Sequence, residues 1–165
     1  MESSLPWQGR AGVTVQSAQA AEGTLAFRLP GWCKDPVIRS AGKRAQVKDG
    51  YLYLTGEWKQ GDTVEIDLPM HLRAMRADHR VRKDTGMTAV QYGPIVYCGE
   101  QCDNGPLLQN IRLDPARVCE GSFRVDEETF GHPIGRIAVP AGRVAPKDGA
   151  LYSEWVPEET SDITL

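Results

Sequence analysis

Short stretches of alternating apolar and polar residues, separated by glycine and proline, constrain this fold most strongly. The 165 residues contain 17 glycines and 11 prolines, spread along the sequence rather than gathered in one segment. No long window holds a helical apolar face that is free of both residue types. Because glycine and proline destabilise helix interiors, this distribution excludes a helical bundle and favours many short strands.

Alternation with a period of two marks the individual strands. In the range 63–68, Val64, Ile66 and Leu68 fall on one face, and Pro69 ends the strand because it has no backbone N–H to donate. Turn signals such as Asp49-Gly50 recur at the spacing that is typical of an antiparallel sandwich. Further strands are predicted at 12–17, 24–29, 51–54, 72–77, 88–92, 94–98, 107–113 and 135–139.

These patterns predict an all-β chain of two parts. An antiparallel, jelly-roll-like β-sandwich is expected over residues 1–97, and a second, smaller β lobe over 98–160. Residues 161–165 restart a strand pattern and are predicted to begin a truncated return strand to the first sandwich. The polar, abrupt start of the chain indicates a domain taken from a longer protein, which leaves the cellular compartment open.

Charge and hydropathy exclude two classes of partner. The formal net charge is −3, so a nucleic acid is not an expected partner. No apolar run is long enough to span a membrane. A basic run at 73–83 alternates along the chain, and this predicts a solvated or inter-domain face rather than an anion site.

Residues with metal-binding or catalytic chemistry are present but poorly arranged. Cys98 and Cys102 form one partial zinc knuckle, whereas Cys33 and Cys119 are isolated, so we expect no metal site and mostly buried free thiols. The histidines have no nucleophile motif beside them. Glu100 and Asp103 form the most tempting acid pair, but one short loop cannot easily place two carboxyl groups on opposite sides of a sugar. We therefore expect no catalytic residue in this chain.

The four tryptophans leave two interpretations open. An exposed indole can stack on a sugar ring, but tryptophan also anchors sandwich cores and interfaces. Trp32 and Trp58 adjoin predicted strand ends, which favours burial. The remaining two tryptophans are Trp7 and Trp155.

Several segments stand in an order that identifies a family. They are Leu5-Pro6-Trp7, Phe27-Arg28-Leu29-Pro30-Gly31-Trp32-Cys33, Trp58–Met70 with its Trp-x-x-Gly-Asp start and Leu-Pro-Met end, and Gln91-Tyr92-Gly93-Pro94-Ile95-Val96-Tyr97-Cys98. Over residues 5–104 the chain resembles the region that follows the catalytic barrel in glycoside hydrolase family 127, the β-L-arabinofuranosidase-like family of bacteria. Each motif is weak alone, but their order is fairly specific.

The resemblance implies where the chemistry of such a protein lies. Family members carry an (α/α)6 barrel with the catalytic acid/base and a zinc-bound cysteine nucleophile, upstream of the part seen here. The four cysteines of this chain are therefore not equated with those zinc and nucleophile cysteines, and no cofactor is expected in this chain. Residues proposed to contact the barrel or a sugar are Trp7, Trp32, Tyr97, Glu100, Asp103 and Asn104.

The predicted function is that of a non-catalytic C-terminal accessory region that supports the barrel of a family-127-like glycoside hydrolase. The alternatives are a carbohydrate-binding module with exposed Trp or Tyr platforms and a small hydrolase in its own right. Expected partners are the parent's catalytic barrel and a plant-derived saccharide. Weak self-association through an open edge strand is also expected, because unpaired edge backbone can pair with another chain.

Overall fold

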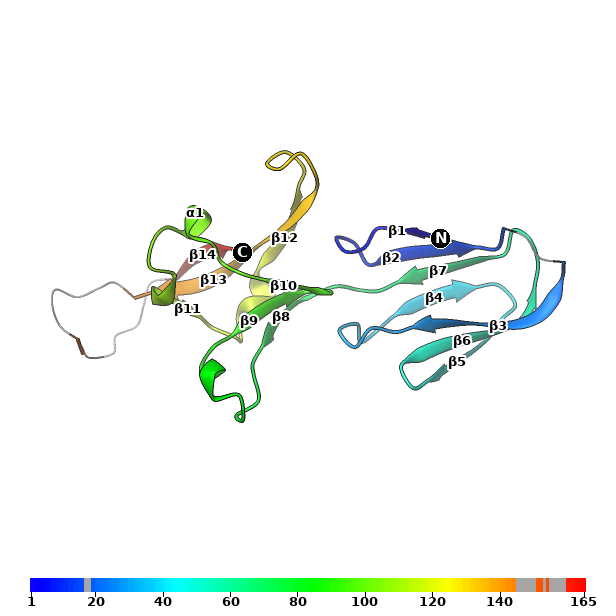
Figure 1. The fold of residues 1–165 in the computed structure, drawn as a ribbon, viewed down its shortest axis with the longest axis horizontal. Helices are drawn as coiled ribbons and strands as arrows, with labels where there is room; N and C mark the ends of the chain where they lie inside the picture. Colours follow the sequence, from blue (N-terminus) through cyan, green and yellow to red (C-terminus); the bar gives the residue numbers. More distant parts are fainter. Residues whose placement is uncertain (17–18, 145–150, 153, 155–159) are drawn as a thin grey trace. The chain divides into compact units, whose positions relative to one another are not determined.

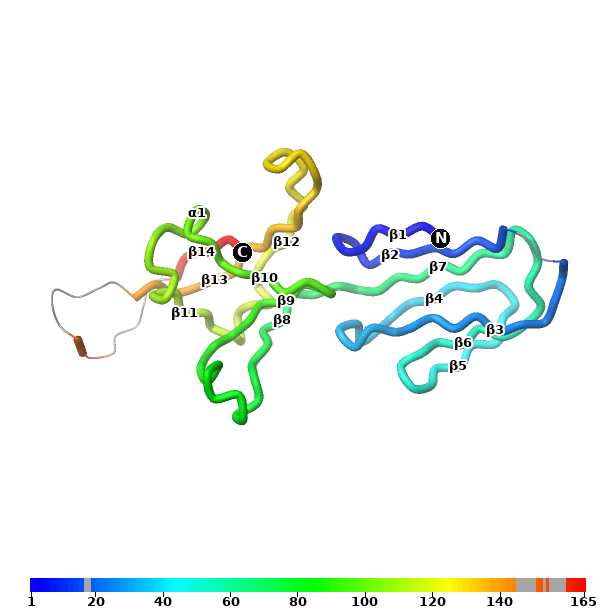
Figure 2. Tube along the Cα trace, viewed as in Figure 1, coloured from blue at the N-terminus to red at the C-terminus, as the bar shows by residue number. Residues whose placement is uncertain are grey.

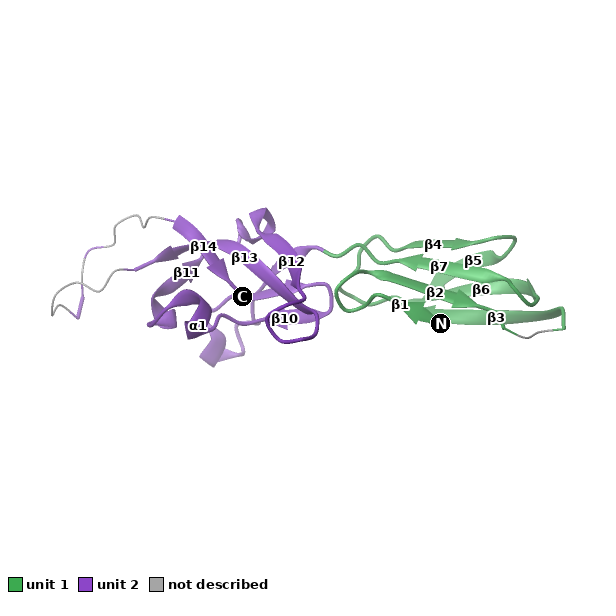
Figure 3. Ribbon diagram, turned by 90° about the horizontal axis from the view of Figure 1, so that it is seen from above, with its two compact units in different colours: residues 1–70 green, residues 71–165 purple. Residues whose placement is uncertain are grey.

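Antiparallel strands are the main regular structure of the computed structural model, which describes residues 1–16, 19–144, 151–152, 154 and 160–165 (Figure 1). The all-β prediction is confirmed. The chain divides into two compact units, Met1–Met70 and His71–Leu165 (Figure 3). This division lies at residue 70 rather than near 97, and the second unit is the longer one. No helix in the described part of the chain is long and apolar enough to cross a membrane.

Unit 1, residues 1–70, is a sandwich of two antiparallel sheets. One sheet has the order β1-β2-β7-β4 and the other has the order β3-β6-β5. The strands are β1 Glu2–Ser3, β2 Arg10–Thr14, β3 Ala21–Arg28, β4 Val37–Ser40, β5 Arg44–Lys48, β6 Tyr51–Trp58 and β7 Thr63–Asp67. Strands β4 and β5 fall in a stretch where the sequence pattern predicted no strand.

The core of unit 1 comes from the inward positions of these strands. Leu52, Leu54 and Trp58 of β6 and Val64 of β7 are buried. Each burial removes apolar surface from water and so favours the folded unit. Partly buried side chains in or next to strands of both sheets complete the cluster: Val13, Val15, Leu25, Phe27, Leu29, Ile38 and Ile66.

Unit 2, residues 71–165, also contains two antiparallel sheets. One has the order β10-β9-β8, and in the other β13 pairs with β11, β12 and β14. The strands are β8 Leu72–Met75, β9 Ala89–Tyr92, β10 Ile95–Tyr97, β11 Ile111–Leu113, β12 Ser122–Asp126, β13 Ile134–Arg143 and β14 Thr160–Thr164. The short helices are α1 Gln101–Asn104, η1 Arg82–Asp84, η2 Leu108–Asn110 and η3 Val118–Glu120.

The last described strand belongs to unit 2. Strand β14 runs beside β13 (Figure 2). Ile163 of β14 lies opposite Val139 of β13, and both are buried in the unit 2 core. Leu165 and Ile137 exchange two backbone hydrogen bonds of 2.8 and 2.9 Å. The strand pattern predicted at 161–165 is therefore real, but it pairs with β13 and not with a strand of the first sandwich.

Candidate functional site

The sequence-predicted residues Glu100, Asp103 and Asn104 lie together on the turn that follows β10. Glu100 precedes helix α1 with extended backbone, and Gly105 ends the helix at φ +74°, a conformation that favours glycine. The turn therefore presents all three side chains within one helical turn. The hydrogen bonds of each side chain decide whether it remains available for binding or catalysis.

Asn104 holds α1 against β14. Its side-chain amide donates to the carbonyl of Thr164 at 2.7 Å and to the carbonyl of Glu100 at 3.0 Å. Its Oδ1 accepts from the backbone N–H of Thr164 at 2.9 Å. Arg143 of β13 adds a further link, because its guanidinium donates to the carbonyl oxygen of Asn104 at 2.6 Å. The amide of Asn104 is therefore committed to the fold.

Asp103 is one end of a charged network. Its Oδ1 lies 3.1 Å from Nη1 of Arg136, whose Nε lies 3.0 Å from Oδ2 of Asp126. Asp126 also accepts hydrogen bonds from the Thr129 hydroxyl and from the N–H groups of Thr129 and Glu128. The hydrogen bonds from Thr129 are the main cause that lowers the pKa of Asp126 well below its usual range. Arg136 thus connects α1 with the hairpin between β12 and β13.

Glu100 and Cys102 complete the turn. The Cys102 thiol donates to Oε2 of Glu100 at 3.4 Å, and this hydrogen bond raises the pKa of the thiol. Ligand atoms of Glu100, Cys102 and Asp103 lie within 4.8 Å of one another, and all three residues are exposed. A metal ion would need a thiolate and would compete with Arg136 for Asp103, so this donor set fits a metal poorly.

Tyr97 of β10 is oriented toward the unit 2 core. It packs with the partly buried residues around that core, and its hydroxyl is buried with no hydrogen-bond partner among the described residues. Burial is the main cause that raises the pKa of Tyr97 to about 12. This hydroxyl is therefore not presented to a ligand at the surface.

Trp7 and Trp32 belong to unit 1, and both are partly buried. Trp7 lies in the turn between β1 and β2, and Trp32 in the loop between β3 and β4. Because Arg10 and Val37 both pair with Asp67, the two loops enter their sheet at the same end.

Trp58 is a core residue, as expected. Its side chain is buried, and its indole Nε1 donates to the carbonyl of Gly23 at 3.1 Å. The Lys43 ammonium lies 4.5 Å from the centre of the indole ring and 2.7 Å from Oδ2 of Asp62. The hydrogen bond from Lys43 is the main cause that lowers the pKa of Asp62. This cluster fixes the β5–β6–β7 region of unit 1 and leaves no indole face for a sugar.

Sequence reasoning missed the residues that hold the α1 turn in place. Arg136, Arg143 and Thr164 reach it from strands more than thirty residues along the chain. One signal was available in the sequence, because Arg136 is the one charged residue in the otherwise apolar stretch 134–142. Such a charge is usually paired, because an unpaired charge in a half-buried strand is costly.

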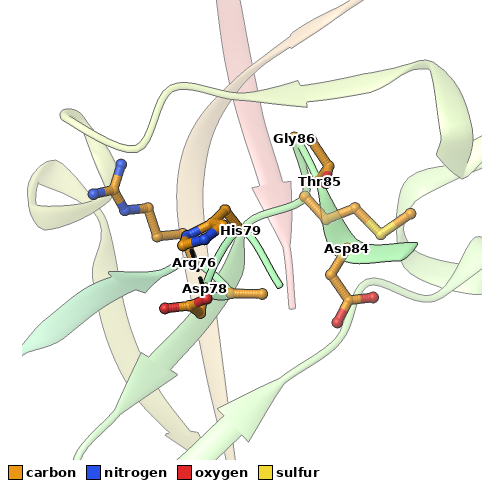
Figure 4. A pocket seen from close by; sticks show the side chains of 8 residues that line it. Arg76, Asp78, His79, Asp84, Thr85 and Gly86 are labelled. Carbon is orange, nitrogen blue, oxygen red and sulfur yellow. Dashed lines mark ion pairs between the residues drawn. The ribbon is translucent and has the colours of Figure 1, made fainter. Parts of the chain in front are cut away.

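Unit 2 also contains two cavities away from the predicted residues. One, of about 620 Å³, lies in the segment between β8 and β9 (Figure 4). The other, of about 490 Å³, is lined mainly by apolar side chains that include Met87, Leu113 and Leu165.

Two family models match adjoining parts of the chain. The model of the β-L-arabinofuranosidase GH127 middle domain matches residues 1–70, and the model of the glycoside hydrolase family 127 C-terminal domain matches residues 72–157. This chain belongs to glycoside hydrolase family 127. The border between the two family-127 domains coincides with the border between unit 1 and unit 2.

Individual family-127 proteins are similar over most of this chain. A non-reducing end beta-L-arabinofuranosidase of Bifidobacterium longum subsp. longum is 41% identical over 150 residues, which cover 86% of this chain and 22% of the relative. A solved GH127 beta-L-arabinofuranosidase from Geobacillus stearothermophilus T6 has a TM-score of 0.81 and 32% identity. A solved GH127 beta-arabinofuranosidase has a TM-score of 0.80 and 26% identity.

The chain spans only part of these relatives. It is covered to 99% in both structural comparisons, but it covers 26% and 27% of the two solved chains. The similarity therefore concerns the two β units and not the remaining three-quarters of those enzymes.

Proposed function

We propose that this chain is a non-catalytic accessory region of a family-127 glycoside hydrolase and that it stabilises the catalytic barrel of its parent. The parent is proposed to act on β-L-arabinofuranosides, the activity named for the relatives. The matched models are a middle and a C-terminal domain of that family, and this is the main support for an accessory role.

The engagement of the candidate carboxylates also supports a non-catalytic role. Glycoside hydrolysis requires two carboxyl groups that face each other across the sugar, one of them able to hold and donate a proton. Asp103 forms an ion pair with Arg136, and Glu100 accepts a hydrogen bond from the Cys102 thiol on the same turn. Neither group is arranged as a general acid opposite the other.

The proposed contacts to the barrel are made by side chains at the surface of each unit. In unit 1 we propose Trp7 and Trp32, because partly buried tryptophans with an accessible edge are frequent anchors at interfaces. In unit 2 we propose the outer side of the α1 turn. Its Glu100 and Asp103 remain exposed although their carboxylates are engaged.

The carbohydrate-binding alternative with aromatic platforms has less support. Trp58 is buried, and Trp155 lies outside the described residues. Trp7 and Trp32 stay the candidates for such a platform. Retardation of the chain on an arabinan gel that is lost in Trp7→Ala or Trp32→Ala would favour this alternative.

Hydrolysis of a nitrophenyl β-L-arabinofuranoside tests the non-catalytic assignment. The chain alone is expected to release no nitrophenol above the buffer rate. Glu100→Gln and Asp103→Asn serve as matched controls for contaminating activity, because they exchange the two candidate carboxylates with little change in shape. Turnover that either variant abolishes would overturn the proposal.

A further inference from the structure

The cavity between β8 and β9 is lined by both polar and apolar side chains. Its volume is about 620 Å³, which is within the range of pockets that bind small organic ligands. Figure 4 shows the side chains that surround it, all from unit 2. Those that offer binding chemistry are Arg76, Asp78, His79, Asp84, Thr85 and Met87.

Hydrogen bonds within the segment hold the lining in place. The N–H of Val81 donates to the carbonyl of Asp78 at 2.9 Å, and the N–H of Asp84 donates to the carbonyl of Val81 at 3.1 Å. The N–H of Met87 then donates to the carbonyl of Asp84 at 3.0 Å. Because three consecutive turns are closed in this way, the backbone that carries Asp78, Asp84 and Met87 is held in place, which lowers the entropic cost of binding.

The carboxylate of Asp78 is kept ionised by its neighbours. Oδ1 of Asp78 accepts from Nε of Arg80 at 2.8 Å and from the backbone N–H of Arg80 at 3.0 Å. The side-chain hydrogen bond from Arg80 is the main cause that lowers the pKa of Asp78. Nδ1 of His79 lies 3.4 Å from the same carboxylate oxygen. An ionised carboxylate has more lone pairs than these donors use, so it can accept further hydrogen bonds.

The other lining groups add further hydrogen-bonding groups and apolar surface around the cavity. Asp84 adds a second exposed carboxylate, Arg76 adds donors, and the Thr85 hydroxyl can donate or accept. Met87 is 64% exposed, and its thioether chain offers a flexible apolar surface. Acceptors, donors and apolar surface therefore meet around one cavity.

We infer that this cavity binds one or two residues of a neutral saccharide. Sugar hydroxyl groups donate to carboxylates and accept from guanidinium and hydroxyl groups, while the C–H face of the ring packs on apolar side chains such as Met87. The two carboxylates repel an anionic ligand, although the basic run lies in the same segment. This binding role goes beyond support of the barrel. Only the choice of an arabinose-containing probe rests on the proposed function.

Titration of the isotope-labelled 165-residue chain, followed by amide NMR, tests this inference. The probes are methyl β-L-arabinofuranoside and D-galactose, each added up to about 100 mM so that a dissociation constant in the millimolar range can be measured. At least one sugar is expected to shift the amide resonances of Gly86 and Met87 in a saturable way. Asp84→Asn is expected to raise the dissociation constant about tenfold through loss of hydrogen bonds to a charged acceptor.

The control is Asp49→Asn, which removes one exposed carboxylate from a unit 1 turn and retains a residue that tolerates the positive φ found there. It is expected to leave the dissociation constant unchanged. No saturable shift with either sugar, or equal affinity in Asp84→Asn and the original chain, would overturn the inference. These outcomes are separate from the hydrolysis assay, because binding at this cavity produces no nitrophenol and hydrolysis requires no shift at Met87.

Discussion

Asn104 and Thr164 are joined by two hydrogen bonds between a side-chain amide and a strand backbone. The amide of Asn104 accepts from the N–H of Thr164 at 2.9 Å and donates to its carbonyl at 2.7 Å. Since the neighbouring Leu165 makes both of its hydrogen bonds to Ile137 of β13, the backbone groups of Thr164 point away from β13. Asn104 thus takes the place of the next strand and closes one position on the outer edge of β14.

Asn104→Ala is expected to reopen this edge. Loss of the two hydrogen bonds leaves backbone groups of Thr164 without partners and lowers the free energy of unfolding by about 1–3 kcal/mol. The freed edge can pair with a second copy of the chain, so weak self-association, which we propose for the original chain, should increase. Light scattering over a range of concentrations measures the mass. Gln101→Ala on the same helix is the control, and an equal, strictly monomeric mass in all three proteins would contradict this role.

Trp58→Ala is expected to destabilise unit 1 by about 3–5 kcal/mol, because it empties a large buried aromatic site. It also removes the hydrogen bond to Gly23 and the ring beneath Lys43. Urea unfolding followed by circular dichroism measures the change. Val47→Ala, at a position that is 65% exposed, should change stability by less than about 0.5 kcal/mol. Equal midpoints for the two variants would show that the indole contributes nothing to the core.

Asp126→Asn is expected to change how stability depends on pH. The pKa of Asp126 is lower in the folded state than in the unfolded chain, mainly through the hydrogen bonds from Thr129, so its ionised form stabilises the fold. This contribution is complete above the ordinary carboxyl pKa of about 4 and is lost as the pH falls toward the lower folded value. The original chain should therefore exceed the variant in stability most clearly at neutral pH.

The difference in stability between Asp126→Asn and the original chain should become smaller as the pH falls below about 4. Thermal unfolding at a series of pH values measures it, with exposed Glu127→Gln as the control. If the melting temperatures of Asp126→Asn and the original chain differ by the same amount from neutral to acid pH, the assigned role of the ionised carboxylate is contradicted.

The purified chain is expected to hold no stoichiometric zinc. Cys98 and Cys102 supply one partial knuckle, and the Cys102 thiol is kept protonated by its hydrogen bond to Glu100. Elemental analysis after dialysis measures the metal content. One tightly held zinc per chain that disappears in Cys98→Ala would refute this prediction.

Local alternation predicted the strands well where one face is buried and the other is solvated. The strand predicted at 63–68 from Val64, Ile66 and Leu68 agrees with β7 to within one residue at each end, and the strand predicted at 88–92 agrees equally well with β9. Strand β5, by contrast, is exposed at every position, so its sequence has no apolar face to reveal it. Within 107–113, only 111–113 is a strand, and 108–110 forms the short helix η2.

The domain border and the α1 contacts could not be read from local patterns. Alternation continues from β7 into β8 with only the four residues 68–71 between them, so the border at residue 70 leaves no gap in the pattern. It is defined by pairing, because β8 pairs with β9 and not with a strand of unit 1. The partners of Asp103 and Asn104 likewise depend on contacts between residues far apart in the chain.

A titration of the separately produced catalytic barrel of the proposed parent enzyme with this chain tests the proposed accessory role most directly. The measurement is the melting temperature of the barrel, followed by a signal of its helices, which this β chain scarcely contributes. Because a ligand that binds only the folded barrel stabilises it, the account predicts a melting temperature that rises and saturates at one chain per barrel. Trp7→Ala and Trp32→Ala should weaken the effect. A melting temperature that stays unchanged at every ratio would contradict the account.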